Sequence, residues 1–345
     1  MITKTGQTWT NLPKLDPSLR VAVLMGGPSS EREISLVSGK QVLSSLEAHR
    51  PIAVEIGRDG SWSVGGVLHR NAGLAVDDLK QRAEVVFIAM HGELGEDGTI
   101  QGLLDSVGLR YAGSGVLGSA LAMDKVRAKL VYKAVGIPSA PFRAISPRDL
   151  SRGLPLAEEL GRELGFPCAV KPARAGSSVG VTFPKSDAEL ARDLGALAGT
   201  DGLVLVEGFV KGREFTCGVI AFEREGRLVP LPVTEIIPDK SRFEFFDYVA
   251  KYTPGATREV TPAQIPDALT ERIQALAVEA HRWLDCRDMS RSDFIVSDTG
   301  ELVILETNTI PGLTPQSLLP QAAAVAGLSF YELVSILIDD ALSRR

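Results

Sequence analysis

The stretch SRSDFIVSDTGELVILETNTIPG, residues 290–312, predicts a β-hairpin. Asp-Thr-Gly at 298–300 is a turn signal, and apolar residues alternate with the opposite face on both sides of it. We expect the strands to pair symmetrically about Thr299 and Gly300. A shift of one residue would move every side chain to the other face, so this register is a specific prediction. The apolar residues of the alternation are Phe294, Val296, Val303 and Leu305.

The predicted register places four polar side chains on one face of the hairpin. Asp293 lies opposite Glu306, and Arg291 lies opposite Asn308, because side chains alternate along a strand. Two carboxylates across a ladder repel each other unless a cation sits between them. Carboxylate and amide oxygens suit Mg²⁺ with a nucleotide phosphate better than zinc, and an arginine beside them can clamp a phosphate or an oxyanion. The face therefore predicts a metal site; the alternative is a solvated face with one ion pair.

Composition restricts the class of protein. The 345 residues suffice for two or three domains, and 44% apolar with 23% charged residues is an ordinary globular balance. The net charge of -6 and the pI near 5.4 argue against a nucleic-acid or anionic-membrane partner. No CxxC pair indicates zinc or a disulfide framework, and no apolar run has the length of a membrane span. Residues 1–19 lack a signal core, so we expect a disordered extension on a cytoplasmic protein.

Alternating strand and helix patterns predict an α/β protein with a parallel sheet in its N-terminal part. The segment 238–266 has turn residues, charges and aromatic residues but weak periodicity, and we expect a mobile lid there. Three Ser-x-x-Glu pairs predict helix starts at Ser30, Ser186 and Ser329. The expected divisions are the extension at 1–19, an N-terminal domain at 20–115, a central domain at 116–211 and a C-terminal domain at 212–345.

Two glycine-rich stretches are candidate phosphate sites. Residues 176–180, Gly-Ser-Ser-Val-Gly, follow a predicted strand that contains Lys171, so their backbone N–H groups are able to approach a polyphosphate. The alternative is a plain β-turn, but a lysine within an apolar strand favours the functional interpretation. Residues 113–118 match GxGxxG, the mark of a dinucleotide-binding oxidoreductase, yet no acidic residue ends a second strand about twenty positions later. We predict only a tight strand-to-helix turn there.

Other polar residues also have a structural alternative, which is the favoured one for Glu31 taken alone. Glu207 and Glu214 flank a segment whose backbone would hydrogen-bond an adenine, and one of these carboxylates would hold the ribose hydroxyls. The alternative is an ordinary strand and loop with exposed acids. Glu31 follows a Gly-Gly turn and would bind a ligand ammonium or stabilise a helix dipole. His91 ends a predicted strand, where α/β proteins place their ligands, or it is a structural histidine.

Six motifs occur in an order that resembles the D-alanine–D-alanine ligases, ATP-grasp enzymes of peptidoglycan synthesis and cell-wall biogenesis. The resemblance runs from Val21 to the C-terminus and implies three α/β domains with ATP between the central and C-terminal ones. The N-terminal extension has no counterpart in the family's core. The motifs are MGGPSSEREISLVSG, MHGELGEDGTIQGLLDSVGLRYAGSG, AMDKVRAK, VKPARAGSSVG, DYVAKY and SDF…ILETNTIPGLTPQSL.

The resemblance also implies roles for individual residues and the cofactor Mg²⁺, which Mn²⁺ is able to replace. Two metal ions would be held by Asp293, Glu306 and Asn308. ATP would contact Lys125, Lys171, Ser178, Glu207, Phe209, Val210 and Glu214. Catalytic roles fall to Glu31, Ser177, Tyr252, Arg291, Gly312 and Lys251, and substrate contacts to His91, Ser317 and Leu318.

The implied reaction joins two D-alanine molecules through an acylphosphate, with ADP and phosphate as products, in a protein expected to be a homodimer. Metal ions and lysines would neutralise the developing phosphoryl charge, and Arg291 with the Gly312 N–H would stabilise the oxyanion. Alternatives are a ligase that forms D-alanine-D-lactate or D-alanine-D-serine, and a non-catalytic nucleotide-binding module. Tyr252 favours the dipeptide, because the lactate-forming relatives are expected to have histidine there.

Overall fold

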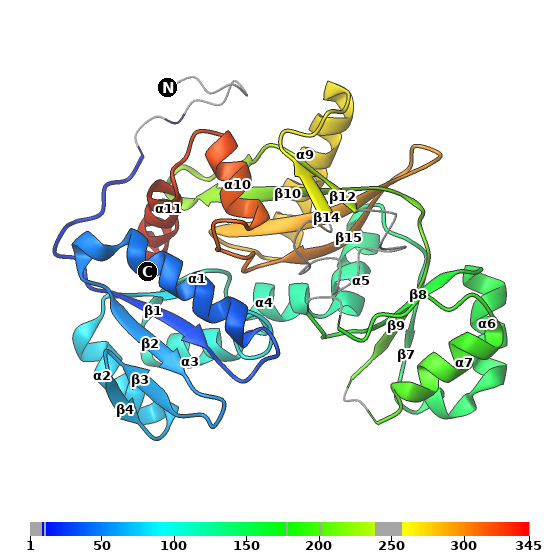
Figure 1. Ribbon diagram of the computed structural model, residues 1–345, viewed down its shortest axis with the longest axis horizontal. Coiled ribbons are helices and arrows are strands. Elements are labelled where there is room, and N and C mark those ends of the chain that lie inside the picture. Colours follow the sequence, from blue (N-terminus) through cyan, green and yellow to red (C-terminus); the bar gives the residue numbers. More distant parts are fainter. Residues whose placement is uncertain (1–8, 10–11, 177–178, 200–201, 239–256, 345) are drawn as a thin grey trace.

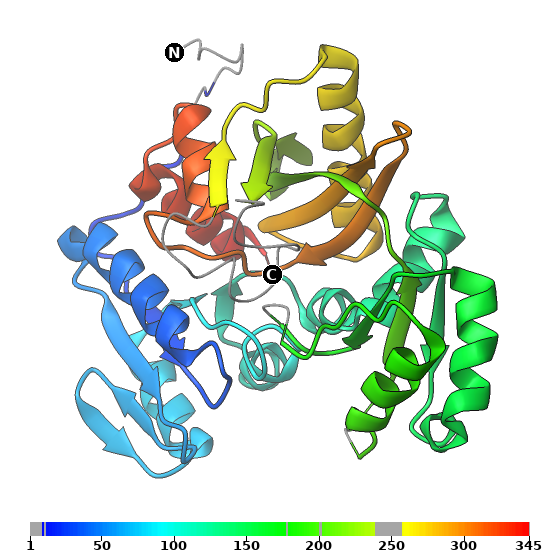
Figure 2. The ribbon, with the colours of Figure 1, turned by 45° about the vertical axis from the view of Figure 1, so that its right-hand side comes forward.

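The computed structural model describes residues 9, 12–176, 179–199, 202–238 and 257–344. Its strands form three separate sheets, of which two are large and one is small. Figure 1 places the N-terminal sheet and the small central sheet on either side, with the C-terminal sheet above and between them. Turning the molecule by 45° keeps this arrangement, with the green central part apart from the blue N-terminal part (Figure 2).

The N-terminal sheet has the strand order β4-β3-β2-β1-β5-β6. β1 pairs in parallel with β2 and β5, and β6 adds in parallel to β5, as the alternating pattern predicts. The far edge differs, because β3 and β4 form an antiparallel hairpin on β2. The elements are β1 Val21–Gly26, α1 Arg32–Ser45, η1 Glu47–His49, β2 Ile52–Ile56, β3 Trp62–Val64, β4 Val67–His69, α2 Ala72–Arg82, β5 Val85–Ile88, α3 Thr99–Val107 and β6 Arg110–Ala112.

The start of α1 corrects one predicted cap. The N-cap of α1 is Glu31, and no side chain caps the helix, so the box predicted at Ser30 and Glu33 is wrong. Ser29 takes part instead, because its hydroxyl accepts a hydrogen bond from the Glu31 N–H (3.0 Å). The caps predicted at Ser186 and Ser329 are confirmed: each hydroxyl accepts the backbone N–H three residues later.

The central sheet is small and antiparallel, with the order β7-β9-β8. Its apolar core lies between this sheet and two helices, α6 and α7, and is separate from the other clusters. Residues 113–115 form the tight turn between β6 and α4, and residues 116–118 begin α4, as predicted for the GxGxxG match. The elements are α4 Val116–Met123, α5 Lys125–Val135, β7 Phe142–Ile145, η2 Asp149–Arg152, α6 Leu154–Leu164, β8 Cys168–Pro172, α7 Asp187–Ala196 and β9 Val204–Gly208.

The C-terminal sheet is antiparallel, with the order β13-β12-β10-β14-β15 and β11 paired to β10. β13 falls inside the predicted lid, so the loop prediction is wrong for Thr257–Val260, which pair with β12. Residues 239–256 of that segment lie outside the described residues. The elements are β10 Gly212–Phe222, η3 Glu223–Glu225, β11 Arg227–Pro230, β12 Thr234–Pro238, β13 Thr257–Val260, α9 Asp267–Trp283, β14 Met289–Ser297, β15 Leu302–Asn308, α10 Leu318–Val325 and α11 Phe330–Ser343.

One apolar core joins the N-terminal sheet to the C-terminal helices. Buried residues of β1 and β5 belong to the same cluster as Leu319 of α10 and Leu337 of α11. α10 and α11 reach the apolar length of a membrane span only as a pair bent by 105°, and no single described helix reaches it. A second core lies under the hairpin β14–β15, between α5 and α9. The two large sheets are therefore packed together, whereas the central sheet has a core of its own.

The N-terminal extension is docked, which corrects the prediction of disorder for its described part. Trp9 is 9% exposed, stacks on Phe222 with ring centroids 5.9 Å apart, and donates its indole N–H to the Ala326 carbonyl (2.5 Å). Leu15 and Leu19 are buried in the shared core. An indole with an apolar partner and a satisfied N–H stabilises a chain segment that has no regular structure.

Trp9→Ala is expected to lower the free energy of unfolding by about 2 kcal/mol, because it exposes apolar surface and removes a buried hydrogen bond. Chemical denaturation measures this change. The control is Trp283→Ala, since that side chain is 54% exposed, and its effect should stay within about 0.5 kcal/mol. Equal unfolding curves for the Trp9 variant and the native chain would mean that the extension is not docked.

Candidate active site

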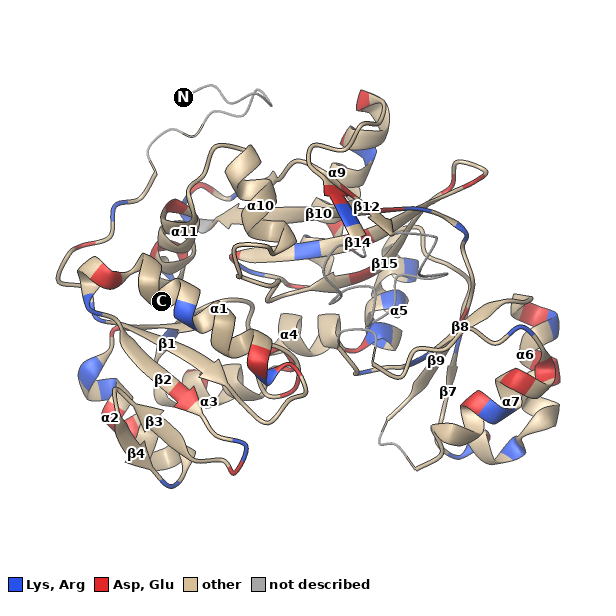
Figure 3. Ribbon diagram, viewed as in Figure 1, with Lys and Arg blue, Asp and Glu red and all other residues tan. Residues whose placement is uncertain are grey.

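A cavity of about 710 Å³ lies where the N-terminal sheet, the hairpin β14–β15 and the loop after β15 meet. Lys125, the first residue of α5, pairs with Glu306 of β15 at this cavity. The ribbon of α5 carries basic positions and lies next to β15 (Figure 3). Twelve site residues, predicted or newly found, line this cavity. They are Glu31, His91, Glu96, Lys125, Gly176, Arg291, Asp293, Glu306, Asn308, Gly312, Ser317 and Leu318.

The hairpin pairs as predicted at its open end but not near its turn. Arg291 pairs with Asn308 and Asp293 with Glu306, which confirms the predicted partners. Beyond Asp293 the register shifts, so that Phe294 pairs with Ile304. The symmetric pairing about Thr299 and Gly300 is therefore wrong. One extra residue on β15, between the pairs of Ile304 and Glu306, forms a β-bulge that compensates for the longer turn.

This bulge decides which residues of β15 reach the core. Leu302 and Ile304 are buried in the cluster that contains Phe294, so the predicted apolar partners Val303 and Leu305 are wrong. In a regular strand Ile304 and Glu306, two residues apart, would share a face. The bulge breaks that alternation and lets Ile304 pack in the core while Glu306 lines the cavity.

Two cations neutralise the facing carboxylates. Arg291 donates from Nε and Nη2 to the two oxygens of Asp293, each at 2.9 Å. Lys125 Nζ lies 3.2 Å from Glu306 Oε2 and also donates to the Ala175 carbonyl (2.9 Å). Thr216 adds a hydrogen bond to Asp293 Oδ1 (2.6 Å). The repulsion expected across the ladder is thus offset by side chains of three different segments, β14, α5 and β10.

The same face fits a hard cation by its donor set. Asp293 and Glu306 supply carboxylate oxygens, and the amide of Asn308 adds a third oxygen donor beside them. Asn308 Nδ2 is buried with no hydrogen-bond partner among the described residues, so the protein alone leaves this amide unsatisfied. No group of three His, Cys, Asp or Glu residues with metal-site geometry occurs in the described chain, which agrees with an oxygen site completed by an amide rather than a zinc site.

Lys171, Glu207 and Lys129 form a buried charge triad behind the cavity. Lys171 Nζ lies 2.5 Å from Glu207 Oε1, and Lys129 Nζ lies 2.7 Å from Glu207 Oε2. Burial raises the pKa of the Glu207 carboxyl, but Lys129 and Lys171 outweigh burial and hold this pKa at about 2. Two ammonium groups and one carboxylate leave one net positive charge, which suits a phosphate.

Glu31 lies between two glycines from different parts of the chain. A Cβ on Gly92 would lie 2.7 Å from Glu31 Oε2, and a Cβ on Gly176 would overlap the same oxygen. The glycine-rich loop predicted to hold phosphate therefore also lies against Glu31, the residue that precedes α1. A side chain at either place would push against the Glu31 carboxylate, and Gly92 also has a left-handed backbone (φ 73°) that favours glycine.

His91 is held by the fold through both ring nitrogens. Its Nδ1–H donates to the Ile310 carbonyl (3.2 Å), and Nε2 accepts from the Ser38 hydroxyl (2.9 Å). Ser38 in turn accepts the Leu313 N–H (3.4 Å). Burial lowers the pKa of His91 to about 4, so the ring is neutral at pH 7. These contacts support the structural alternative, because His91 ties β5 to the loop that follows β15.

That loop places Gly312 and Ser317 together. A Cβ on Gly312 would lie 2.6 Å from Ser317 Oγ, and this hydroxyl accepts the Thr314 N–H (3.1 Å). Ser317 is the N-cap of α10 but does not cap it with its side chain, and Leu318 is the first helical residue. The loop therefore presents backbone N–H groups and a helix start to the cavity, an arrangement that favours anions.

The predicted adenosine residues lie on the central and C-terminal sheets. Phe209 and Val210 occupy the link between β9 and β10, Phe209 packs edge-on against Phe183 with centroids 5.7 Å apart, and Glu214 is in β10. Neither they nor Glu207 line the cavity. Four predicted site residues lie outside the described residues: Ser177, Ser178, Lys251 and Tyr252.

Two family models match almost the whole chain. The model described as D-ala D-ala ligase N-terminus matches residues 20–114, and the model described as D-ala D-ala ligase C-terminus matches residues 131–339. The chain belongs to this ligase family. A D-alanine–D-alanine ligase of Syntrophobacter fumaroxidans is 44% identical over 324 residues, which cover 94% of this chain and 98% of that one. The ligase of Desulfotalea psychrophila is 44% identical over 332 residues, with 94% and 96% covered.

Solved structures of the family have the same fold. The D-alanine–D-alanine ligase of Bacillus anthracis complexed with ATP has a TM-score of 0.76 at 30% identity, with 94% of this chain and 97% of that chain covered. A D-Ala:D-Ser ligase of Enterococcus faecalis has a TM-score of 0.79 at 29% identity, with 94% and 99% covered. The fold is thus the ATP-grasp fold of these ligases, and the oxidoreductase suggested by GxGxxG is excluded.

Sequence reasoning missed two site residues of this ligase fold. Glu96 accepts the Gly92 N–H (2.6 Å), and burial together with the charge of Glu31 raises its pKa to about 8. Its only signal was its place in the motif HGELGEDG. Lys129 lies one helical turn after Lys125 on α5, but nothing in the sequence indicated that it pairs with Glu207.

Glu207→Gln is expected to destabilise the protein by about 3–5 kcal/mol, because it leaves two buried lysines without their shared carboxylate. Lys129→Met should cost clearly less, about 2 kcal/mol or below, since Lys171 and Glu207 remain a balanced pair. Denaturant unfolding of both variants tests this order. The reverse order would show that the triad does not act as one unit.

Proposed function

We propose that the chain joins two D-alanine molecules with hydrolysis of ATP to ADP and phosphate, for peptidoglycan precursor synthesis. The relatives with 44% identity over most of the chain are named for this activity. The observation that carries the proposal is that a candidate ammonium ligand, Glu31, lines one cavity with Arg291 and with the Asp293–Glu306 pair. An amino acid, its reacting carboxylate and a phosphate would then meet in that cavity.

The first step forms an acylphosphate. Glu31 holds the ammonium of the first D-alanine, and the carboxylate of that substrate attacks the γ-phosphorus of ATP as the bond to ADP breaks. Lys125 at the cavity wall and Lys171 in the triad supply positive charge to the phosphates. Glu207, Phe209, Val210 and Glu214 would line the adenosine site, with Ser178 near the phosphates.

Asp293, Glu306 and Asn308 would hold Mg²⁺, whose chemistry is to neutralise and align phosphate oxygens. Their oxygens share one face of the hairpin, with the Asn308 side-chain oxygen as the third ligand. Arg291 and Lys125 neutralise the two carboxylates from the sides. The protein therefore orients both acids by its own contacts.

The second step forms the peptide bond. The amine of the second D-alanine attacks the acyl carbon, and phosphate leaves. Arg291 uses Nε and Nη2 on Asp293, and its Nη1 makes no hydrogen bond to the described residues, so we assign Nη1 and the Gly312 N–H to the oxyanion. Ser317 and the first turn of α10 at Leu318 would receive the carboxylate of the second substrate.

Several assignments rest on the sequence alone. Ser177 and Tyr252 would orient Glu31, Lys251 would reach the transferred phosphate, and the lid would exclude water from the acylphosphate. His91 would contribute to the first substrate's site by holding the loop at Ile310. The domain divisions after residues 19, 115 and 211, the homodimer and the cytoplasmic location also stay predictions.

Glu306→Gln is expected to lower D-alanine-dependent phosphate release by about 100-fold or more, because it removes one charge from the metal-binding pair. Direct titration of Mg²⁺ should show weaker binding in the same variant. Glu301→Gln is the control, since Glu301 lies at the exposed turn of the same hairpin and should leave both measurements unchanged. Native-like Mg²⁺ binding by the Glu306 variant would remove the hairpin from the metal assignment.

Tyr252→His is expected to shift the acceptor from D-alanine toward D-lactate, most visibly below about pH 7. Tyrosine is neutral there and does not repel an ammonium, whereas histidine becomes cationic as the pH falls and tolerates a hydroxyl better. Product analysis with both acceptors present, across pH, measures the preference. Unchanged products at every pH would exclude Tyr252 as a determinant of acceptor choice.

A further inference from the structure

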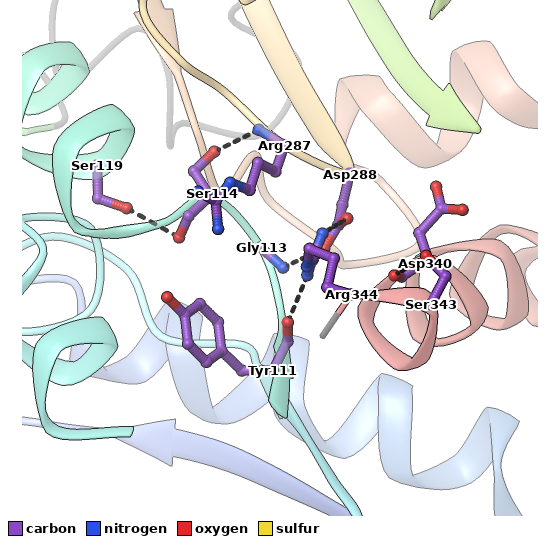
Figure 4. Close-up of polar contacts among 9 residues, drawn as sticks. All are labelled: Tyr111, Gly113, Ser114, Ser119, Arg287, Asp288, Asp340, Ser343 and Arg344. Carbon is purple, nitrogen blue, oxygen red and sulfur yellow. Dashed lines mark hydrogen bonds and ion pairs between the residues drawn. The ribbon is translucent and has the colours of Figure 1, made fainter. Parts of the chain in front are cut away.

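The GxGxxG turn, residues 113–118, packs against the segment that leads into the hairpin (Figure 4). The Gly113 N–H donates to Asp288 Oδ2 (2.5 Å), and the Arg287 N–H donates to the Ser114 hydroxyl (3.0 Å). Gly113 directly follows β6 of the N-terminal sheet, and Asp288 directly precedes β14 of the C-terminal sheet. The turn is therefore a contact surface between the N-terminal sheet and the start of β14.

The glycines of this motif permit the close approach. A Cβ on Gly115 would lie 3.1 Å from the Arg287 guanidinium, and a Cβ on Gly118 would overlap the Asp285 carbonyl. Asp285 and Asp288 have left-handed backbone conformations, with φ of 56° and 57°, which aspartate tolerates better than most residues. The motif thus provides room for a second chain segment rather than for a dinucleotide.

Arg344 closes the contact from the C-terminal end of α11. It pairs with both oxygens of Asp288, through Nη1 to Oδ1 and through Nη2 to Oδ2 (2.9 Å), and Nη2 also donates to the Tyr111 carbonyl of β6 (2.6 Å). The Asp288 side chain is fully buried. A buried carboxylate with a bidentate arginine and a backbone N–H is directional, unlike the apolar core that the same segments share.

We propose that Asp288 and Arg344 are positioning residues, which hold the hairpin and the N-terminal sheet at the separation that the reaction needs. Asp288 immediately precedes β14, the strand that carries Arg291 and Asp293 three and five residues later. β6 pairs with β5, and β5 runs directly into His91 and the Glu31 pocket. The inference rests on the proposed roles of Glu31 and Arg291 at one substrate.

The first test compares two arginines that pair with acids near α11. Arg344→Ala should raise the KM for D-alanine about tenfold while the affinity for ATP changes less than about twofold, because Lys171 and Glu207 lie on the central sheet with its own core. Arg344→Lys should restore part of the loss. The control is Arg224→Ala, which breaks a pair with Asp339 of α11 (3.0 Å) and should leave both constants unchanged.

The second test compares two glycines inside helices. Gly118→Ala places a methyl group against the Asp285 carbonyl and should raise the KM for D-alanine in the same way as Arg344→Ala. Gly195→Ala of α7 has no heavy atom within 4 Å of its added Cβ and should leave the KM unchanged. Hydrogen exchange at the Gly113 amide reads the contact without turnover and should accelerate in the Arg344 and Gly118 variants only.

A lower kcat with unchanged KM for D-alanine in Arg344→Ala would overturn the proposal, because loss of folded protein alone produces that result. Unchanged exchange at Gly113 in this variant would overturn it as well. A chain that releases no phosphate with D-alanine contradicts the proposed function instead, and the exchange measurement still reports whether Asp288 and Arg344 hold the two sheets together.

Discussion

Asp293 and Glu306 face each other across one antiparallel ladder, and their mutual repulsion is the constraint that the surrounding structure satisfies. Arg291 comes from the same strand as Asp293, Lys125 from the first turn of α5, and Thr216 from the neighbouring strand β10. Each of these segments places a positive charge or a hydroxyl donor beside one of the two acids. These contacts thus connect the hairpin β14–β15, the helix α5 and the strand β10.

The positions of the three sheets follow from how their cores are divided. The N-terminal sheet shares its apolar core with α10 and α11, and Arg344 adds directional contacts between β6 and Asp288. The central sheet keeps a core of its own between α6, α7 and its strands. The substrate face, with Glu31, Arg291 and the loop at Gly312, is therefore built between two parts that are packed together. The Lys171–Glu207–Lys129 triad joins the central sheet, which holds Lys171 and Glu207, to α5, which holds Lys129 and packs in the core under the hairpin.

Much of the local structure was predictable because it depends on neighbours in the chain. The strand that contains Lys171, Cys168–Pro172, and the helix starts at Ser186 and Ser329 agree with the predictions. The partners Asp293–Glu306 and Arg291–Asn308 were also correct, although the turn between the strands was not symmetric. Predictions were wrong where a contact between residues far apart in the chain determines the local structure. Ser30 does not cap α1, because the neighbouring Ser29 hydroxyl hydrogen-bonds the His91 carbonyl. Trp9 is ordered because it stacks on Phe222 and donates its N–H to the Ala326 carbonyl.

The sequence by itself determined the family, the order of the motifs and the chemical types of the site residues, because these are properties of residue identity and spacing. Tertiary structure alone decided which side chains of β15 face the core, because a bulge before Glu306 lets Ile304 pack in the core while Glu306 lines the cavity. It also decided that Lys129 balances Glu207 and that the GxGxxG turn receives Asp288. These pairs are far apart in the chain, so no local pattern records them. Their energies come from burial, which exists only after the sheets have packed.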